Sequence, residues 1–267
     1  MRYFRRQITI MIVSDPNFPY KAIIFNLDGV LVDTASYHYT AWRMLANGLG
    51  FDFTEQQHEA LRGLSRMASL ERILQWGGIY MSEAEQLHLA DVKNNWYTKL
   101  ITEVKPSNVL PGVVTLLEEL RENGIQLALS SASRSARNVL KSTNLELFFD
   151  EVVDGYSTRK SKPDPECFQL AARALGKSPA DCMVFEDSML GVKAAIYGGF
   201  TVVGIGRDEY LQEAHYVIPG FQGLSFENLA AILTNESIIS NLNWFAWSHL
   251  RQKSGHFLPD EADFCRP

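Results

Sequence analysis

The segment from Ile23 to Thr34 most strongly constrains what this chain can fold into. It is an apolar run, Ile-Ile-Phe, that ends at two polar residues, Asn26 and Asp28, before a glycine and a second apolar stretch. A short apolar run rich in β-branched residues is typical of a buried strand. Side chains alternate between the faces of a strand, so Asn26 and Asp28 would point to the same side. The segment therefore predicts a buried strand whose end presents two polar groups.

Similar apolar runs recur along the chain, with helical patterns between them. Pro111 and Gly124 are expected as first-turn and stop residues of a helix over 113–123, and Asp164-Pro165 as the cap and first turn of a helix that runs to about 175. A third helix is expected over 188–197. Alternating strands and helices predict an α/β fold, a doubly wound parallel sheet. The expected strands are 21–25, 125–131, 151–153, 182–186, 201–205 and 216–218.

The region from Ser36 to Glu103 interrupts this alternation with helical patterns only. It is too long for an ordinary crossover between strands, which favours a separate helical cap domain over helices that simply pack on the sheet. The predicted organisation is an N-terminal extension (1–20), a core domain (21–35 and 104–235), an inserted all-helical cap (36–103) and a C-terminal extension (236–267).

Net charge, apolar runs and cysteine spacing bear on which partners this chain binds and on its place in the cell. The net charge of −6 gives no electrostatic case for nucleic-acid binding. Apolar runs stay far below the roughly 20 residues that span a bilayer, so no membrane association is expected. Cys167, Cys182 and Cys265 are widely spaced and indicate reduced thiols in a cytoplasmic protein.

Both ends of the chain are ambiguous. Three arginines precede the apolar run 8–13, which resembles the start of a secretory signal, but the run is short and lacks a cleavage site, so an N-terminal extension is favoured. The aromatic residues of the tail 237–267 suggest a helix packed on the body or a contact with a protein partner. We expect a monomer.

Several chemically capable side chains follow the predicted strands. In an open α/β sheet, ligands bind beyond the carboxyl ends of the strands. Acids there can hold Mg²⁺, and a lysine and a hydroxyl can neutralise and orient phosphate oxygens. Taken singly, Glu186-Asp187 could be a favourable helix start, Lys162 a solvated side chain and Ser131 a turn residue. The candidates at strand ends are Asn26, Asp28, Ser131, Ala132, Ser133, Arg134, Lys162, Glu186 and Asp187.

In combination these residues resemble a known superfamily. Asn-x-Asp-Gly-Val, then Ser131, then Lys-Pro-Asp-Pro from Lys162, then Glu-Asp-Ser-x-x-Gly from Glu186 resemble the four motifs of the haloacid dehalogenase superfamily of phosphoryl-transfer enzymes, apart from Asn26. The stretches 33–42, 61–70 and 93–97 further resemble the β-phosphoglucomutase family, over roughly 21–233. That family interconverts β-glucose 1-phosphate and glucose 6-phosphate through glucose 1,6-bisphosphate, which also serves as primer.

The resemblance implies roles for individual residues. Asn26 stands at the position of the phosphorylated aspartate, and Asp28 matches the general acid/base. Ser131 and Lys162 would hold the transferring phosphoryl group. Mg²⁺ would be held by position 26, the carbonyl of Asp28, Glu186 and Asp187. Arg66 resembles the arginine that holds the other phosphate. The remaining matches to the sugar-phosphate pocket are Thr34, His38, Trp42, Gly63, Leu64, Ser65, Ser69, Lys93, Ala132, Ser133 and Arg134; Trp42 alone is equally typical of a helix core.

Asn26 sets this chain apart from the family pattern. An amide is a far poorer nucleophile than a carboxylate, and loss of a nucleophile in an unrelated protease cost on the order of 10⁶ in turnover. The chain as written should be nearly without covalent catalysis. Substitution to stop turnover, natural loss of catalysis with retained binding, and partial deamidation back to aspartate each account for Asn26; the intact remaining motifs favour the first.

Two other functions share most of these motifs. One is a phosphatase acting on a small sugar or nucleotide phosphate, which would share the core motifs with the phosphomutase family and differ from it only in the cap. The other is a non-catalytic protein that binds a sugar phosphate, which Asn26 and the aromatic tail suggest.

Overall fold

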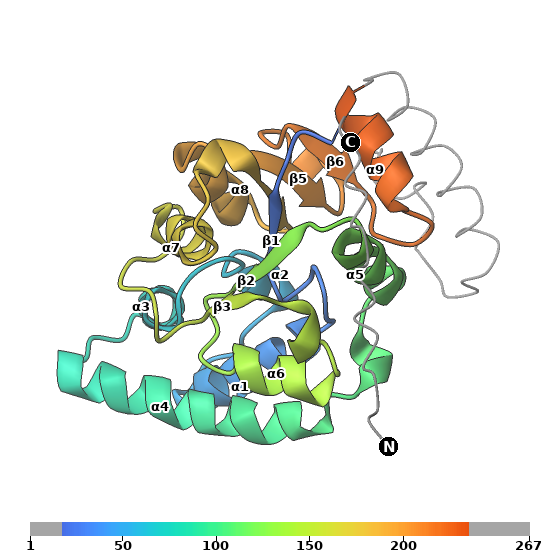
Figure 1. Cartoon of the computed structure of the whole chain (residues 1–267). Coiled ribbons are helices and arrows are strands. Elements are labelled where there is room, and N and C mark those ends of the chain that lie inside the picture. The colour runs from blue at the N-terminus through green and yellow to red at the C-terminus, as the bar shows by residue number, and fades with distance from the viewer. Residues whose placement is uncertain (1–17, 235–267) are drawn as a thin grey trace, which may run out of the picture.

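The computed structural model describes residues 18–234 and is centred on a parallel sheet of six strands (Figure 1). The strand order is β3-β2-β1-β4-β5-β6, and every neighbouring pair is parallel. The chain thus winds outward from β1 in one direction and then, from β4, in the other, which confirms the doubly wound prediction. The strands are β1 (Ala22–Phe25), β2 (Gln126–Ser130), β3 (Glu151–Val153), β4 (Cys182–Glu186), β5 (Thr201–Ile205) and β6 (Tyr216–Ile218), all as predicted to within a residue.

Helices cover both faces of the sheet because its strands are apolar on both sides. In β1, Ile23 and Phe25 join one buried cluster and Ala22 and Ile24 join the other. The first cluster packs under α5 (Val113–Glu122), α6 (Ala136–Ser142) and α9 (Phe226–Thr234). The second packs under α7 (Glu166–Ala174) and α8 (Met189–Tyr197).

Two predicted helix starts require correction. Pro111 lies before α5 and not in its first turn, because Gly112 begins the helix with φ 84°. A side chain at Gly112 would also overlap the Phe221 carbonyl, so glycine is required there. The helix after Asp164-Pro165 begins one residue later than expected, at Glu166. Pro165 is therefore the N-cap residue in place of Asp164, although the Asp164 Oδ1 accepts a hydrogen bond from the Glu166 N–H at 3.0 Å.

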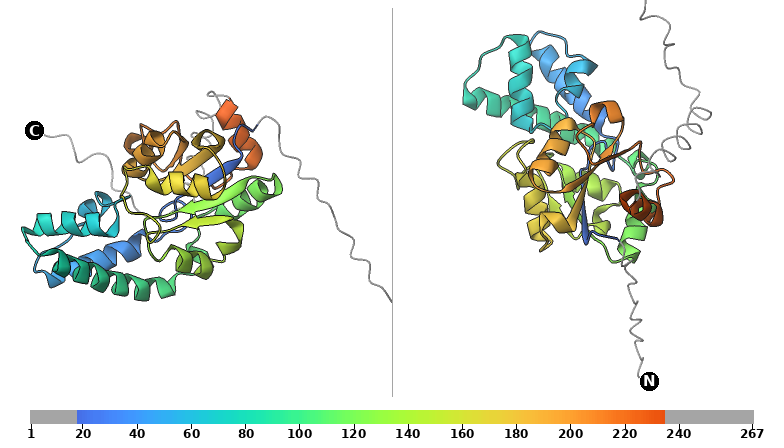
Figure 2. Two further views of the ribbon diagram at one scale, coloured as in Figure 1. Left: turned by 60° about the vertical axis from the view of Figure 1, so that its left-hand side comes forward. Right: turned by 90° about the horizontal axis from the view of Figure 1, so that it is seen from above.

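The helical region forms a lobe of its own at one end of the sheet (Figure 2). This helical lobe comprises α1 (Ala35–Gly48), α2 (Glu55–Glu59), α3 (Arg66–Gly77) and α4 (Glu83–Leu100). Its interior is a third apolar cluster that includes Trp42, Phe53, Leu70 and Ile73. The helices are as predicted; the boundaries of a cap domain stay a prediction. Short 3₁₀ turns lie at Ile101–Glu103, Pro106–Asn108, Glu146–Phe148, Pro179–Asp181 and Asp208–Tyr210.

Cys167 and Cys182 are buried free thiols, as predicted. Within residues 18–234, the longest helices are too short or too polar to cross a membrane. Cys265, the N-terminal apolar run and the aromatic tail lie outside the described residues.

Replacement of Ile73 by alanine should destabilise the protein. Ile73 is fully buried in the cluster of the helical lobe, so truncation leaves a cavity and should lower the free energy of unfolding by about 2–5 kcal/mol. Leu87→Ala on α4 is the control, because Leu87 is 48% exposed and should cost less than about 0.5 kcal/mol. Urea denaturation would measure both. Equal effects would contradict a separately packed lobe.

Candidate active site

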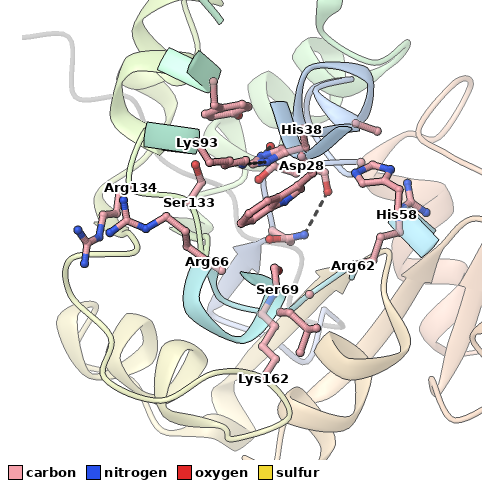
Figure 3. A pocket seen from close by; sticks show the side chains of 18 of the residues that line it. Asp28, His38, His58, Arg62, Arg66, Ser69, Lys93, Ser133, Arg134 and Lys162 are labelled. Carbon is pink, nitrogen blue, oxygen red and sulfur yellow. Dashed lines mark hydrogen bonds and ion pairs between the residues drawn. The ribbon is translucent and has the colours of Figure 1, made fainter. Parts of the chain in front are cut away.

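A cleft of about 900 Å³, partly open to solvent, lies between the carboxyl ends of the strands and the helical lobe. Figure 3 shows Asp28 and Lys162 from the sheet domain and Arg66 and Lys93 from the lobe around one space. Most of the predicted site residues line it, namely Asn26, Asp28, His38, Trp42, Gly63, Leu64, Arg66, Ser69, Lys93, Ala132, Ser133, Arg134, Lys162 and Asp187. Segments far apart in the sequence therefore meet in one cleft.

Four predicted site residues do not line the cleft, and three of them contact residues that do. Thr34 donates its hydroxyl hydrogen to Asp28 Oδ1. Ser131 Oγ accepts a hydrogen bond from the Ser133 N–H at 3.1 Å. Ser65 is bound to the core, because its hydroxyl accepts a hydrogen bond from Ser161 at 2.6 Å. The fourth, Glu186, is fully buried beneath α8.

Asn26 lies at the centre of the strand ends. Its backbone N–H donates to the Phe185 carbonyl, which extends the pairing of β1 with β4 by one residue. Its Nδ2 donates to the Asp28 carbonyl at 3.2 Å and to Asp187 Oδ1 at 3.0 Å. Gly29, with φ 74°, lets the chain turn here, and a side chain at that position would overlap Asp187. The amide thus joins the first and last motifs.

Glu186 forms an ion pair with Lys162, and both side chains are buried. Its other oxygen accepts hydrogen bonds from the N–H and the hydroxyl of Ser188, at 2.6 and 3.0 Å. Burial acts to lower the pKa of Lys162, but the charge and hydrogen bond of Glu186, together with the nearby Cys167 and Asp187, outweigh it and the pKa is raised. Lys162 is therefore a fixed cation at the cleft wall. Both carboxylate oxygens of Glu186 are thus engaged, one by Lys162 and the other by Ser188, and its role as a metal ligand stays a prediction.

Asp187 is the carboxylate that faces the cleft beside Asn26. Burial and the neighbouring Glu186 charge raise its pKa to about 8, against the opposing charges of Arg62 and Lys162. The Arg62 guanidinium lies 3.5 Å from Asp187 Oδ2. This contact joins the helical lobe to the sheet domain.

Three groups at this point could supply oxygens to Mg²⁺: the Asn26 side chain, if its Oδ1 took the place of the Nδ2 that points here, the Asp28 carbonyl and Asp187. Contacts of 3.0 and 3.2 Å from one amide nitrogen show that the last two converge on a common place. Mg²⁺ commonly binds through one or two carboxylates together with substrate phosphates, so the donor set fits. Within the described residues, His, Cys, Asp and Glu side chains form no metal-holding group of three or more, because position 26 is an amide and Asp28 offers its carbonyl.

A second polar chain runs from Asp28 into the helical lobe. His38 Nε2 lies 3.7 Å from Asp28 Oδ1, and Lys93 Nζ lies 3.2 Å from His38 Nδ1. When Lys93 is protonated it can only donate, and the imidazole proton then lies on Nε2, toward Asp28. Burial acts to raise the pKa of Asp28, yet His38 and Thr34 outweigh it and the pKa is lowered. Asp28 is thus held as an anion.

Lys93 is enclosed by aromatic rings and is only 3% exposed. Its Nζ lies 4.4 Å from the centre of the Trp42 ring and 4.8 Å from that of Tyr97. Burial lowers its pKa to about 7, against the opposing charge of Asp28. Trp42 lines the cleft and also belongs to the lobe core, and its contact with a substrate stays a prediction.

Arg66 lies on another side of the cleft, beside Arg134. Its Nη1 contacts Asp91 at 3.0 Å, while its buried Nε has no hydrogen-bond partner among the described residues. Burial and the Arg134 charge lower the pKa of Arg66. Arg134 in turn stacks on Tyr156, 4.8 Å from the ring centre. This side of the cleft carries unneutralised positive charge and a free donor.

The sequence interpretation missed six residues that line the cleft: Gly29, Ala35, His58, Arg62, Asn94 and Tyr97. Arg62 precedes Gly63 in the same break between helices, and Asn94 and Tyr97 follow Lys93. Their positions next to predicted site residues could have indicated that they line the cleft. The position of His58 gave no such indication. Tyr97 is 1% exposed, stacks on His38 at 4.0 Å between ring centres, and its hydroxyl lacks a partner among the described residues.

The depressed pKa of Lys93 predicts a pH effect on stability. The unfolded chain holds this proton up to about pH 10.5 and the folded chain only to about 7, so the penalty for burying the charge is full below pH 7 and fades between pH 7 and 10.5. Lys93→Met should therefore stabilise the protein at pH 6, by up to about 4 kcal/mol, and progressively less toward pH 10.

Denaturation at several pH values would test this prediction. Lys99→Met, an exposed lysine on the same helix, is the control and should show no such trend. A Lys93→Met effect that is constant with pH would contradict the buried, partly neutral lysine.

Comparisons with known proteins agree with this geometry. A family model for haloacid dehalogenase-like hydrolases matches residues 20–199. β-Phosphoglucomutase from Bacillus subtilis is 38% identical over 211 residues, which cover 78% of this chain and 93% of that protein. A phosphorylated carbohydrates phosphatase from Thermotoga maritima is 33% identical over 186 residues, covering 67% of this chain and 82% of that protein.

A solved structure gives the same result. The crystal structure of β-phosphoglucomutase from Clostridium difficile matches with a TM-score of 0.76 and 40% identity, covering 79% of this chain and 95% of that chain. The shared sheet, the clustered strand-end residues and these matches together show that the chain belongs to the haloacid dehalogenase-like hydrolase family.

Proposed function

We propose that this chain binds a sugar phosphate in the cleft, in a site of the β-phosphoglucomutase type whose nucleophile position is occupied by Asn26. The relatives named β-phosphoglucomutase and phosphorylated carbohydrates phosphatase support a sugar phosphate as the ligand class. The observation that carries the proposal is the placement of cations on different sides of the cleft, with an acid between them.

The two groups of cations suit the two phosphate positions of a sugar bisphosphate. Lys162 and Arg62 lie near Asn26 and Asp187, while Arg66 and Arg134 lie together on another side (Figure 3). Arginine and lysine contacts to phosphate are strong because both partners are charged. A phosphate monoester would place its phosphate at one group and its sugar toward the other.

Between the cations, Asp28 is placed to handle a proton on a sugar hydroxyl. Its carboxylate is held by Thr34 and faces His38, and its pKa is lowered, so it is ready to accept a proton. In the family reaction this group would assist phosphoryl transfer between a sugar hydroxyl and position 26. Mg²⁺, when held at Asn26, Asp28 and Asp187, would supply charge stabilisation to the phosphoryl group.

Asn26 removes the step that needs a nucleophile. The side chain keeps the shape of aspartate, and its amide is engaged with Asp28 and Asp187, so the cleft geometry is retained. We infer that the chain keeps ligand binding and does not form a phosphoenzyme. Asn26 alone therefore favours a non-catalytic binding role for this chain.

Replacement of Asn26 by aspartate should create Mg²⁺-dependent conversion of β-glucose 1-phosphate to glucose 6-phosphate, with glucose 1,6-bisphosphate as primer. The expected gain over the native chain is at least about 10³-fold, because a lost nucleophile costs on the order of 10⁶ elsewhere. Asn94→Asp, which adds a carboxylate elsewhere on the cleft wall, is the control and should bring no gain.

The products distinguish the alternatives. Isomerisation of β-glucose 1-phosphate by the Asn26→Asp protein supports the mutase site. Release of phosphate from many sugar phosphates without isomerisation would favour a phosphatase. If the folded Asn26→Asp protein carried out neither reaction, that result would contradict the proposed site.

A further inference from the structure

Every carboxylate near Asn26 already has a positively charged or donating partner from the protein. Glu186 is paired with Lys162, and Asp28 accepts from Thr34 and faces His38. Asp187 receives the Asn26 amide on Oδ1 and lies beside the Arg62 guanidinium on Oδ2. With aspartate at position 26, the same place would hold a second facing carboxylate.

We propose that Arg62 and the Asn26 amide do, in this chain, the charge-neutralising work of the divalent cation, so that the cleft binds a phosphate monoester without Mg²⁺. The inference rests on the proposed function for its ligand class. It concerns two residues of this chain, one of them absent from the family pattern and the other supplied by the helical lobe.

The contacts of Asn26 carry the first step. Its Nδ2 sits within 3.2 Å of the Asp28 carbonyl and 3.0 Å of Asp187 Oδ1, two of the oxygens that would hold the cation. A bound cation and these two hydrogen bonds exclude each other, because Nδ2 occupies the space between the same oxygens. An aspartate has no hydrogen to donate there and would instead add charge.

The position of Arg62 carries the second step. Its guanidinium is 3.5 Å from the remaining oxygen of Asp187, and Asp187 is 7% exposed, so the pair is shielded from solvent on the carboxylate side. A phosphate approaching Asn26 would otherwise meet the Asp187 carboxylate, which repels it whenever that group is ionised. Arg62 offsets the charge of the ionised form. Its Nη1 donates to Glu59 Oε1 at 3.1 Å, and the remaining N–H groups of the guanidinium, which has five donors, are left for Asp187 and the phosphate.

The close approach of lobe and core fixes Arg62 in this place. Gly63, the next residue, has φ 79°, and a side chain there would come within 2.6 Å of Ser188 Oγ. Ser65 accepts a hydrogen bond from Ser161 of the core at 2.6 Å. Arg62 therefore reaches Asp187 from a segment of the helical lobe that is held against the sheet domain by Gly63 and Ser65.

Calorimetric titration with glucose 6-phosphate, in EDTA and in Mg²⁺, tests the inference. The native chain should bind with the same affinity in both buffers, to within about twofold. Arg62→Gln should weaken binding in EDTA by about tenfold or more, the size expected for a lost contact to a charged group, and Mg²⁺ should not restore it because Asn26 still occupies the place of the cation. Asn26→Asp should bind glucose 6-phosphate at least about tenfold more tightly with Mg²⁺ than with EDTA.

Arg43→Gln is the matched control. Arg43 pairs with Asp52 on the helical lobe at 3.4 Å and does not line the cleft, so its loss removes the same charge elsewhere and should leave binding unchanged. Circular dichroism of each variant would establish that it is folded.

Three results would overturn the inference. They are a native affinity that rises tenfold or more with Mg²⁺, an Arg62→Gln protein that binds like the native chain in EDTA, and a native chain that binds glucose 6-phosphate in neither buffer. Turnover by Asn26→Asp together with either of the first two results would leave the proposed function standing, whereas the third result would also count against binding of a sugar phosphate by this chain. If the Asn26→Asp protein showed no turnover while the native chain bound glucose 6-phosphate equally with and without Mg²⁺, the mutase chemistry would be rejected and the further inference would stand.

Discussion

The parallel pairing of β1 with β2 and β4 is the constraint on which the site depends. Phe25 is in register with Leu129 on one side and Phe185 on the other, so the three strands end level with one another. The residues that follow therefore emerge together at one edge of the sheet, as expected for ligand sites in open α/β folds. Apolar burial on both faces fixes this register, since a slip of one residue would exchange the two clusters that flank β1.

This constraint also explains how much the sequence could predict. Strand positions and rim residues follow from apolar runs and their ends, and Asn26, Asp28, Lys162 and Asp187 indeed share one cleft. The direction of each side chain does not follow. Glu186 is the last residue of β4 and points beneath α8, where Lys162 engages it, whereas Asp187 turns into the cleft. The difference of one residue decides which carboxylate faces a ligand, and neighbouring sequence does not show it.

The helical lobe is predictable in its helices but not in its contribution to the site. Helical periodicity locates the apolar faces, and the lobe's own cluster confirms them. Which polar residues face the sheet depends on how the lobe is docked, and that depends on close contacts such as Gly63 against Ser188. Arg62 reaches Asp187 and Tyr97 stacks on His38 only because of this docking. Such contacts join residues more than a hundred positions apart, or on different helices, and leave no local pattern.

Asn26 differs from aspartate in charge and in hydrogen-bonding sense, and hardly in shape. A carboxylate oxygen in place of Nδ2 would lie 3.0 Å from Asp187 Oδ1. Repulsion between two ionised carboxylates is strong at such a short distance, so they would need a cation between them. The amide reverses this requirement, because it donates to Asp187 directly. The same exchange that removes the nucleophile thus also removes the main electrostatic reason for the metal. Under the proposed function, binding and catalysis, which share one set of residues in the family pattern, are physically separable in this chain.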